Sequence, residues 1–250
     1  MLLTSCATVK PIPVLVYHQI ALAPPRGAAF RSLYVSPDAF SRQLQLLKIL
    51  GYRGLSMSAL LPYLMGEKTG KVVGITFDDG FLNNLTQALP VLQRFDFSST
   101  CYVVSQRLGQ FNDWDKGSGI APAPLMDAAQ LRAWVAGGQE VGAHTRHHVH
   151  LPRLSDIDSA LEIKAGKVEL ERAIGRPVQH FCYPYGEYLP AHVPAVRNAG
   201  FFTATTTQRS RCLAGHDFLQ LPRVPVVRST TLLMLWMKLA TRYEDRRSNR

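Results

Sequence analysis

Two adjacent aspartates, Asp78 and Asp79, follow directly on the mostly apolar run 72–77. Such a run predicts a buried strand, and successive side chains at a strand end point in different directions. One carboxylate could therefore bind a cation while the other faces a substrate, and a cation would lower the pKa of both groups. The alternative is an ordinary turn, because Asp-Asp-Gly is also common turn chemistry.

A histidine cluster follows a second predicted strand, residues 140–143. His144 and His148 are four residues apart, so both imidazoles would lie on one side if the chain turned helically after the strand. By spacing alone, His147 and His150 could also bind such an ion. The alternative is that the histidines cluster by chance.

The two clusters together predict a catalytic metal site. Two histidines and one carboxylate form a facial set of ligands that leaves positions open for water, which favours catalysis over a structural role. Such a set suits several divalent ions, so the expected cofactor is Zn, Ni, Co or Fe.

Short apolar runs alternate with amphipathic stretches along the whole chain. The helix expected at 155–174 is the longest, and the predicted strands are 14–17, 72–77, 99–104, 140–143, 181–183, 201–205 and 224–227. Strands that are apolar on both faces predict a parallel sheet covered by helices, either a barrel or an open doubly wound sheet. In a β/α barrel the chemistry lies at the carboxyl ends of the strands.

The composition indicates one globular domain of 250 residues, 46% hydrophobic and 18% charged. No apolar run approaches the roughly 18 residues of a membrane-spanning helix. The net charge of +10 is interpreted as a solvated basic surface, part of it in a basic C-terminal tail at 241–250. No nucleic-acid partner is expected, because no helix-turn-helix or zinc-finger pattern is present. Nothing in the sequence indicates an oligomeric state.

Residues 1–10 form a separate N-terminal segment. Leu3-Thr4-Ser5-Cys6 resembles the lipobox of bacterial lipoproteins, but only two residues precede it, and a secretion signal needs a basic region and an apolar region there. One interpretation is a true start upstream, with membrane attachment through a lipid on Cys6. Chance is the alternative.

Three ordered motifs resemble those of a known family. They are Thr76-Phe77-Asp78-Asp79-Gly80, His144-Thr145-x-x-His148-x-x-Leu151 and Tyr183-Pro184-Tyr185-Gly186. This set resembles the motifs of the polysaccharide deacetylases of carbohydrate esterase family 4, and Leu221-Pro222-Arg223 is similar to a late segment of that family. The resemblance spans residues 13–227. It implies an α/β fold, a distorted (β/α) barrel expected to have seven strands, within a deacetylase domain at 11–240.

The resemblance also implies a role for each site residue. Asp78 would be the general base, and Asp79, His144 and His148 would be the metal ligands. The backbone N–H of Tyr185 would stabilise the oxyanion.

Two departures from the family pattern point to one branch of it. Cys182 stands where the family usually has an arginine, and no late general-acid histidine follows Arg223. The beginning Pro13-Val-Leu-Val-Tyr-His18 resembles the circularly permuted branch that deacetylates poly-β-1,6-N-acetylglucosamine, in which the N-terminal strand replaces the last one. His18 then becomes the candidate acid.

The resemblance implies a metal-dependent hydrolase that removes N-acetyl groups from an amino-sugar polysaccharide, most readily poly-β-1,6-N-acetylglucosamine. Peptidoglycan or chitooligosaccharides are alternative substrates, and a non-catalytic polysaccharide-binding module is an alternative function. The expected location is the periplasm or cell envelope. The loop 109–124 is expected to border the sugar groove, with Trp114 as a flat face for a pyranose ring; the alternative is that Trp114 packs locally.

Overall fold

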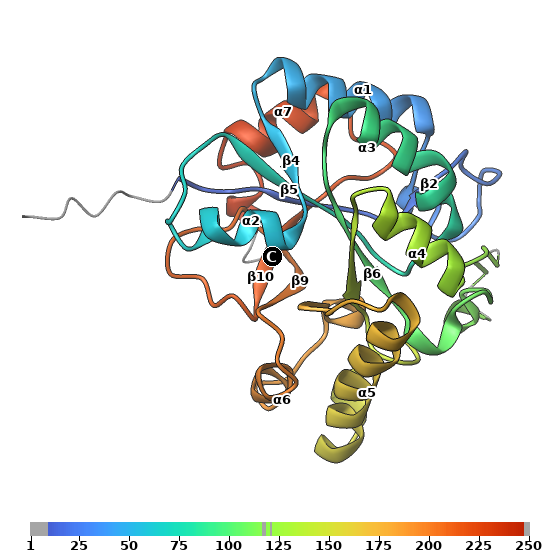
Figure 1. The fold of residues 1–250 in the computed structure, drawn as a ribbon. Coiled ribbons are helices and arrows are strands. Elements are labelled where there is room, and N and C mark those ends of the chain that lie inside the picture. Colours follow the sequence, from blue (N-terminus) through green and yellow to red (C-terminus); the bar gives the residue numbers. More distant parts are fainter. Residues whose placement is uncertain (1–9, 117–118, 121, 248–250) are drawn as a thin grey trace, which may run out of the picture.

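Seven parallel strands close into a barrel (Figure 1). The computed structural model describes residues 10–116, 119–120 and 122–247, so the lipobox-like segment around Cys6 lies outside the described residues. The barrel strands are β1 (Val14–Tyr17), β5 (Val72–Phe77), β6 (Thr100–Val103), β7 (Glu140–Ala143), β8 (His180–Cys182), β9 (Thr203–Arg209) and β10 (Leu221–Pro225). Their order is β1-β10-β9-β8-β7-β6-β5, and β5 pairs again with β1. The predicted seven-stranded barrel is confirmed.

The N-terminal strand closes this barrel beside the last strand. Leu15 of β1 is in register with Val224 of β10 on one side and with Ile75 of β5 on the other. The carboxyl end of β1, and His18 with it, is therefore brought next to the carboxyl end of β5.

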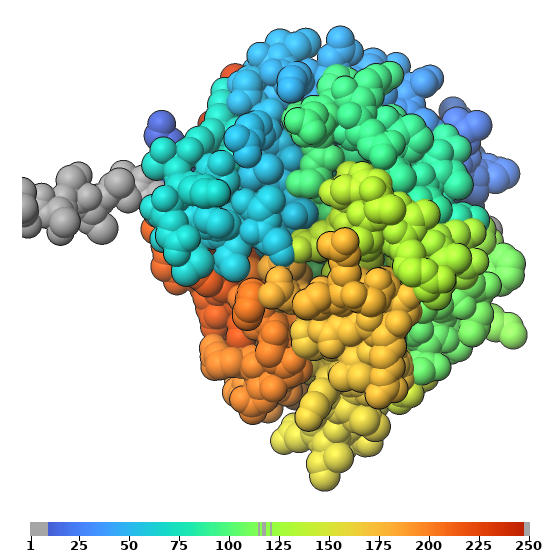
Figure 2. All heavy atoms as spheres, in the orientation of Figure 1, coloured from blue at the N-terminus to red at the C-terminus, as the bar shows by residue number. Residues whose placement is uncertain are grey.

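Helices surround the strands (Figure 1), and the space-filling view in the same orientation shows side chains filling the space between the ribbons on this face (Figure 2). The helices are α1 (Pro37–Ile49), α2 (Met57–Leu64), α3 (Leu89–Phe95), α4 (Ala128–Ala136), α5 (Asp156–Ile174), α6 (His192–Asn198) and α7 (Leu232–Ala240). Local signals set their ends: the Ser155 hydroxyl caps α5, and Gly175 ends it with φ 69°.

Three strands and one helix were not predicted from the sequence. They are α2, which contains Pro62, the strand β4 (Arg53–Leu55), and the two-residue strands β2 (Gln19–Ile20) and β3 (Tyr34–Val35). β4 pairs with the beginning of β5, and β2 pairs with β3. Such short segments carry too few residues for a periodic pattern to be recognised.

The strands bury side chains on both faces. Phe77 faces outward, where its ring lies 5.8 Å from that of Phe40 in α1 and 5.9 Å from that of Trp134 in α4. The neighbouring Thr76 faces inward, where its hydroxyl accepts a hydrogen bond from Nη1 of Arg223. Because side chains fill the interior, the barrel is a packed core, and a ligand can bind only at its ends.

Residues 241–247, expected to belong to the basic tail, pack on the barrel domain. Glu244 is fully buried and forms ion pairs with Lys238 and, at 2.8 Å, with Arg209. Asp245 lies 2.7 Å from Arg211. Within the part of the chain that the structure describes, no helix combines the length and apolarity needed to span a bilayer.

Candidate active site

The predicted site residues come together at the carboxyl end of the barrel. β1 leads to His18, β5 to Asp78 and Asp79, β7 to His144 and the loop bearing His148, and β8 to the loop bearing Tyr185. This is the end of the barrel at which parallel strands place catalytic groups.

Asp79, His144 and His148 form a compact set of three donors. Oδ1 of Asp79 is 3.3 Å from Nε2 of His148 and 3.6 Å from Nε2 of His144. One donor atom from each residue lies within 4.8 Å of the others, and all three residues are buried. Donors so close together, from three separate loop positions, fit a single divalent ion between them.

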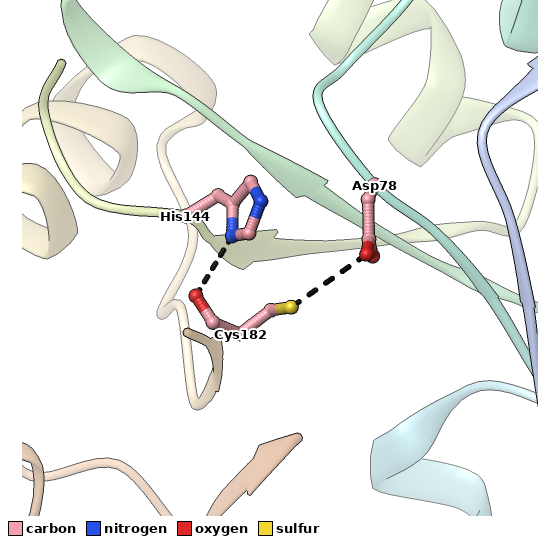
Figure 3. Close-up of side chains that lie close together, drawn as sticks. All are labelled: Asp78, His144 and Cys182. Carbon is pink, nitrogen blue, oxygen red and sulfur yellow. Dashed lines mark hydrogen bonds between the residues drawn. The ribbon is translucent and has the colours of Figure 1, made fainter. Parts of the chain in front are cut away.

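Hydrogen bonding prepares His144 for this role. Its Nδ1 lies 2.7 Å from the carbonyl oxygen of Cys182 (Figure 3). A carbonyl can only accept, so Nδ1 carries the proton and Nε2 presents its lone pair toward Asp79.

The pKa of Asp79 favours the ionised form. Burial alone would raise this pKa, but the hydrogen bond and the charge of His148, the two largest opposing effects, lower it below its usual value. The group is therefore a carboxylate, as a metal ligand must be.

His144 and His148 are brought together without the helical turn that was considered for this segment. The segment is a loop in which Thr145 and His148 both adopt left-handed conformations, with φ of 62° and 57°. Among the described residues, six non-glycine residues have positive φ, and four lie here; besides these two they are Asp79 and Tyr185. Each costs on the order of 1 kcal/mol or more, and such strain gathers where a particular side-chain geometry is required.

The competing histidines are directed elsewhere. Nδ1 of His147 donates to Glu162 at 2.6 Å, and Nδ1 of His150 lies 2.8 Å from Glu187. Neither belongs to a donor cluster of the described residues, so the structure favours His144 and His148.

Asp78 is held by an arginine that the sequence analysis did not assign. Nη1 and Nη2 of Arg223 each donate to one Asp78 oxygen at 2.7 Å, and both residues are buried. Burial would raise the pKa of Asp78, but the Arg223 charge and hydrogen bonds hold it well below its usual range. Asp78 is therefore ionised, and its two oxygens have a fixed orientation.

Arg223 lies beside Cys182, the position at which the family usually has an arginine. Its Nη2 donates to the Cys182 sulfur at 3.1 Å, and that thiol lies 3.8 Å from Asp78 Oδ2 (Figure 3). The family's usual arginine would come from β8, whereas this one comes from β10. The available signal was an arginine within a strand that is otherwise apolar, since a buried charge needs a partner.

His18 and Tyr185 lie at the edges of the site. Nε2 of His18 is 4.0 Å from Asp78 Oδ2, and its side chain is 25% exposed. The Tyr185 ring meets His148 edge-on at 4.5 Å and stacks on His150 at 4.0 Å.

Trp114 packs against a proposed metal ligand. Its ring stacks on His148 with centroids 4.6 Å apart and an angle of 25° between the planes. It also packs on a small apolar cluster of Phe81, Ala123 and Leu125. Local packing is therefore present; contact with a sugar stays a prediction.

Fold and site together define a (β/α)-barrel enzyme, since a closed parallel barrel carries carboxylates and histidines at the carboxyl ends of its strands. A family model described as polysaccharide deacetylase matches residues 65–204. The poly-β-1,6-N-acetyl-D-glucosamine N-deacetylase of Staphylococcus epidermidis is 23% identical over 215 residues, covering 81% of this chain and 72% of that protein.

Two solved structures are similar over nearly their whole length. The Streptococcus pyogenes deacetylase PplD in complex with acetate has a TM-score of 0.81 and 26% identity, covering 93% of this chain and 99% of that one. IcaB from Ammonifex degensii has a TM-score of 0.77 and 26% identity, covering 92% and 97%. The chain belongs to the polysaccharide deacetylase family, as its motifs predicted.

Proposed function

We propose that this protein is a metal-dependent hydrolase that removes N-acetyl groups from an amino-sugar polysaccharide. The observation that carries the proposal is the convergence of Asp79, His144 and His148 beside the ionised carboxylate of Asp78. A divalent ion held by the three donors would supply Lewis acidity, which polarises an amide carbonyl and acidifies water.

The chain's own residues would handle the protons. Asp78, fixed by Arg223, would accept a proton from the attacking water. The backbone N–H of Tyr185 would donate to the developing oxyanion. His18, whose Nε2 lies 4.0 Å from Asp78 Oδ2, would donate a proton to the leaving amine, so that acetate and a free amino sugar are released.

Poly-β-1,6-N-acetylglucosamine is the proposed substrate. The name of the Staphylococcus epidermidis relative and the closure of the barrel by the N-terminal strand support it. Peptidoglycan and chitooligosaccharides are the alternatives within the same chemistry. A complete donor set argues for catalysis over a binding module. We further propose a location in the periplasm or cell envelope, where exported polymer is found, and lipid attachment at Cys6.

The test is acetate release after EDTA treatment and addition of Zn²⁺, Co²⁺ or Ni²⁺. We expect β-1,6-linked N-acetylglucosamine oligomers to be hydrolysed faster than chitooligosaccharides. Asp79→Ala should lose both metal binding and activity, whereas Asp78→Asn should bind metal but lose turnover by about 10²-fold or more. Asp217→Ala, which removes a half-exposed carboxylate, is the control. Wild-type turnover in Asp78→Asn would exclude Asp78 as the base.

A further inference from the structure

The loop between His144 and His148 needs an external support, because it lacks the hydrogen bonds of a helix. Two of its residues are left-handed, yet it must hold both imidazoles near Asp79. Part of the support comes from the loop after β6, where the backbone N–H groups of Ser105 and Gln106 donate to carbonyls of Thr145 and Arg146.

The other part is a buried carboxylate on α5. Oε2 of Glu162 accepts the backbone N–H of Arg146 at 3.0 Å and that of His147 at 3.1 Å. Oε1 accepts from Nδ1 of the His147 side chain at 2.6 Å. Glu162 is only 9% exposed. One side chain thus binds two consecutive peptide groups in the middle of the loop.

The same face of α5 is shaped to receive the loop. Gly166, one helical turn beyond Glu162, has no side chain, and a Cβ there would lie 3.1 Å from the carbonyl carbon of Thr145. Glu169, a further turn along, binds Nε of Arg146 at 2.9 Å and the Ser105 hydroxyl at 2.6 Å.

We propose that Glu162 is a positioning residue of the metal centre. Its carboxylate fixes the Arg146 and His147 peptide groups, and this sets where His148 presents Nε2 to the ion. The inference rests on the proposed metal site at Asp79, His144 and His148. Because both peptide N–H groups donate to the same oxygen, Oε2, a glutamine that places its amide oxygen there keeps these two bonds and gives up only the bond from His147 Nδ1.

The experiment titrates Co²⁺ into EDTA-treated protein that has been dialysed free of chelator. Glu162→Asp keeps the charge but shortens the side chain by one methylene, and we expect Co²⁺ affinity to fall about tenfold, as for other partners that orient metal ligands. Glu162→Gln keeps the length and one acceptor oxygen, so its affinity should stay closer to that of the wild type.

Glu171→Asp is the matched control. Glu171 is also on α5 and also accepts a backbone N–H, that of Val178 at 3.0 Å, but it does not bind the metal-site loop. We expect its Co²⁺ affinity to match the wild type. Thermal unfolding in EDTA checks that the Glu162→Asp and Glu171→Asp variants lose comparable stability.

The outcomes separate the two proposals. Equal Co²⁺ affinity in wild type and Glu162→Asp, the same loss in Glu171→Asp, or weaker binding by Glu162→Gln than by Glu162→Asp would overturn the positioning role alone. A wild-type protein that binds no Co²⁺ would overturn the metal site and this inference together.

Discussion

The pair formed by Asp78 and Arg223 offers a sharp test of how the barrel interior is held together. Both side chains are at most 5% exposed, and two hydrogen bonds of 2.7 Å join them. Nε of Arg223 also donates to the Thr206 carbonyl at 2.9 Å. Arg223→Met keeps the length and apolar volume of the stem but leaves the Asp78 charge buried without its counterion.

The expected loss of unfolding free energy follows from this burial. Removing one partner of a buried ion pair costs about 3–5 kcal/mol, because the remaining charge cannot be hydrated. Asp78→Asn should lose a similar amount of unfolding free energy, because it leaves the buried guanidinium of Arg223 without its counterion. Replacing both residues removes both charges, so the double variant should lose no more than either single variant. The coupling free energy between the two positions should therefore be about 3 kcal/mol.

The coupling free energy is measured with a double-mutant cycle, by urea unfolding of the metal-free wild type, both single variants and the double variant in EDTA, followed by circular dichroism. Losses of unfolding free energy that add within about 0.5 kcal/mol would refute the pairing, since the losses at uncoupled sites are additive.

The pH dependence provides a second check. The folded pKa of Asp78 is lowered, so the pair contributes fully above the unfolded carboxyl pKa of about 4 and is lost only as pH falls toward the folded value. In Arg223→Met, however, burial of Asp78 is no longer offset by the guanidinium, so the pKa of Asp78 rises in that variant. The penalty of the substitution should therefore shrink as pH falls from about 8 toward 5, because protonation neutralises the buried carboxyl group.

Three further predictions concern the edges of the site and the C-terminal segment. His18→Gln should lower kcat about 10²-fold with unchanged Co²⁺ affinity, and an unchanged kcat would exclude His18 as the acid. Trp114→Ala removes the ring stacked on His148, so it should weaken Co²⁺ binding. It should also abolish any fluorescence change on adding oligosaccharide. Trp114→Phe should preserve Co²⁺ binding. Asp245→Asn breaks the ion pair with Arg211. Because the pKa of Asp245 is lowered in the folded protein, the variant should lose about 1 kcal/mol of unfolding free energy at pH 7, measured by urea unfolding. The difference from the wild type should vanish as pH falls below about 4. A loss independent of pH would contradict the ion-pair explanation.

Local sequence was sufficient for much of the architecture. The apolar runs that form β5 and β7 were recognised because strands buried on both faces are continuously apolar. The helix expected at 155–174 agrees with α5 to within one residue, and the structure shows that Ser155 caps it and Gly175 ends it. Polar residues directly after such strands indicated where the site lies.

Local reasoning could not decide the conformation of the segment that joins the two histidines. A separation of four residues between His144 and His148 suits a helical turn, yet the chain passes through left-handed Thr145 and His148 instead. Intrinsic preference disfavours that path for residues other than glycine. Contacts with Glu162 and with the loop after β6 hold it in place, and these lie outside any local pattern.

By itself, the sequence determined the seven barrel strands and most of the helices, and it indicated the candidate donor residues, because side-chain chemistry and burial periodicity are properties of short segments. The arginine that orients Asp78 was decided by the tertiary structure alone. Closing the barrel brings β10 and β8 around the same axis, so Arg223 reaches a carboxylate far away in the chain, beside the cysteine that stands where an arginine was expected. A buried positive charge could come from position 182 on β8 or from position 223 on β10. The choice between them depends on the space inside the closed barrel, and that space exists only once all seven strands have assembled.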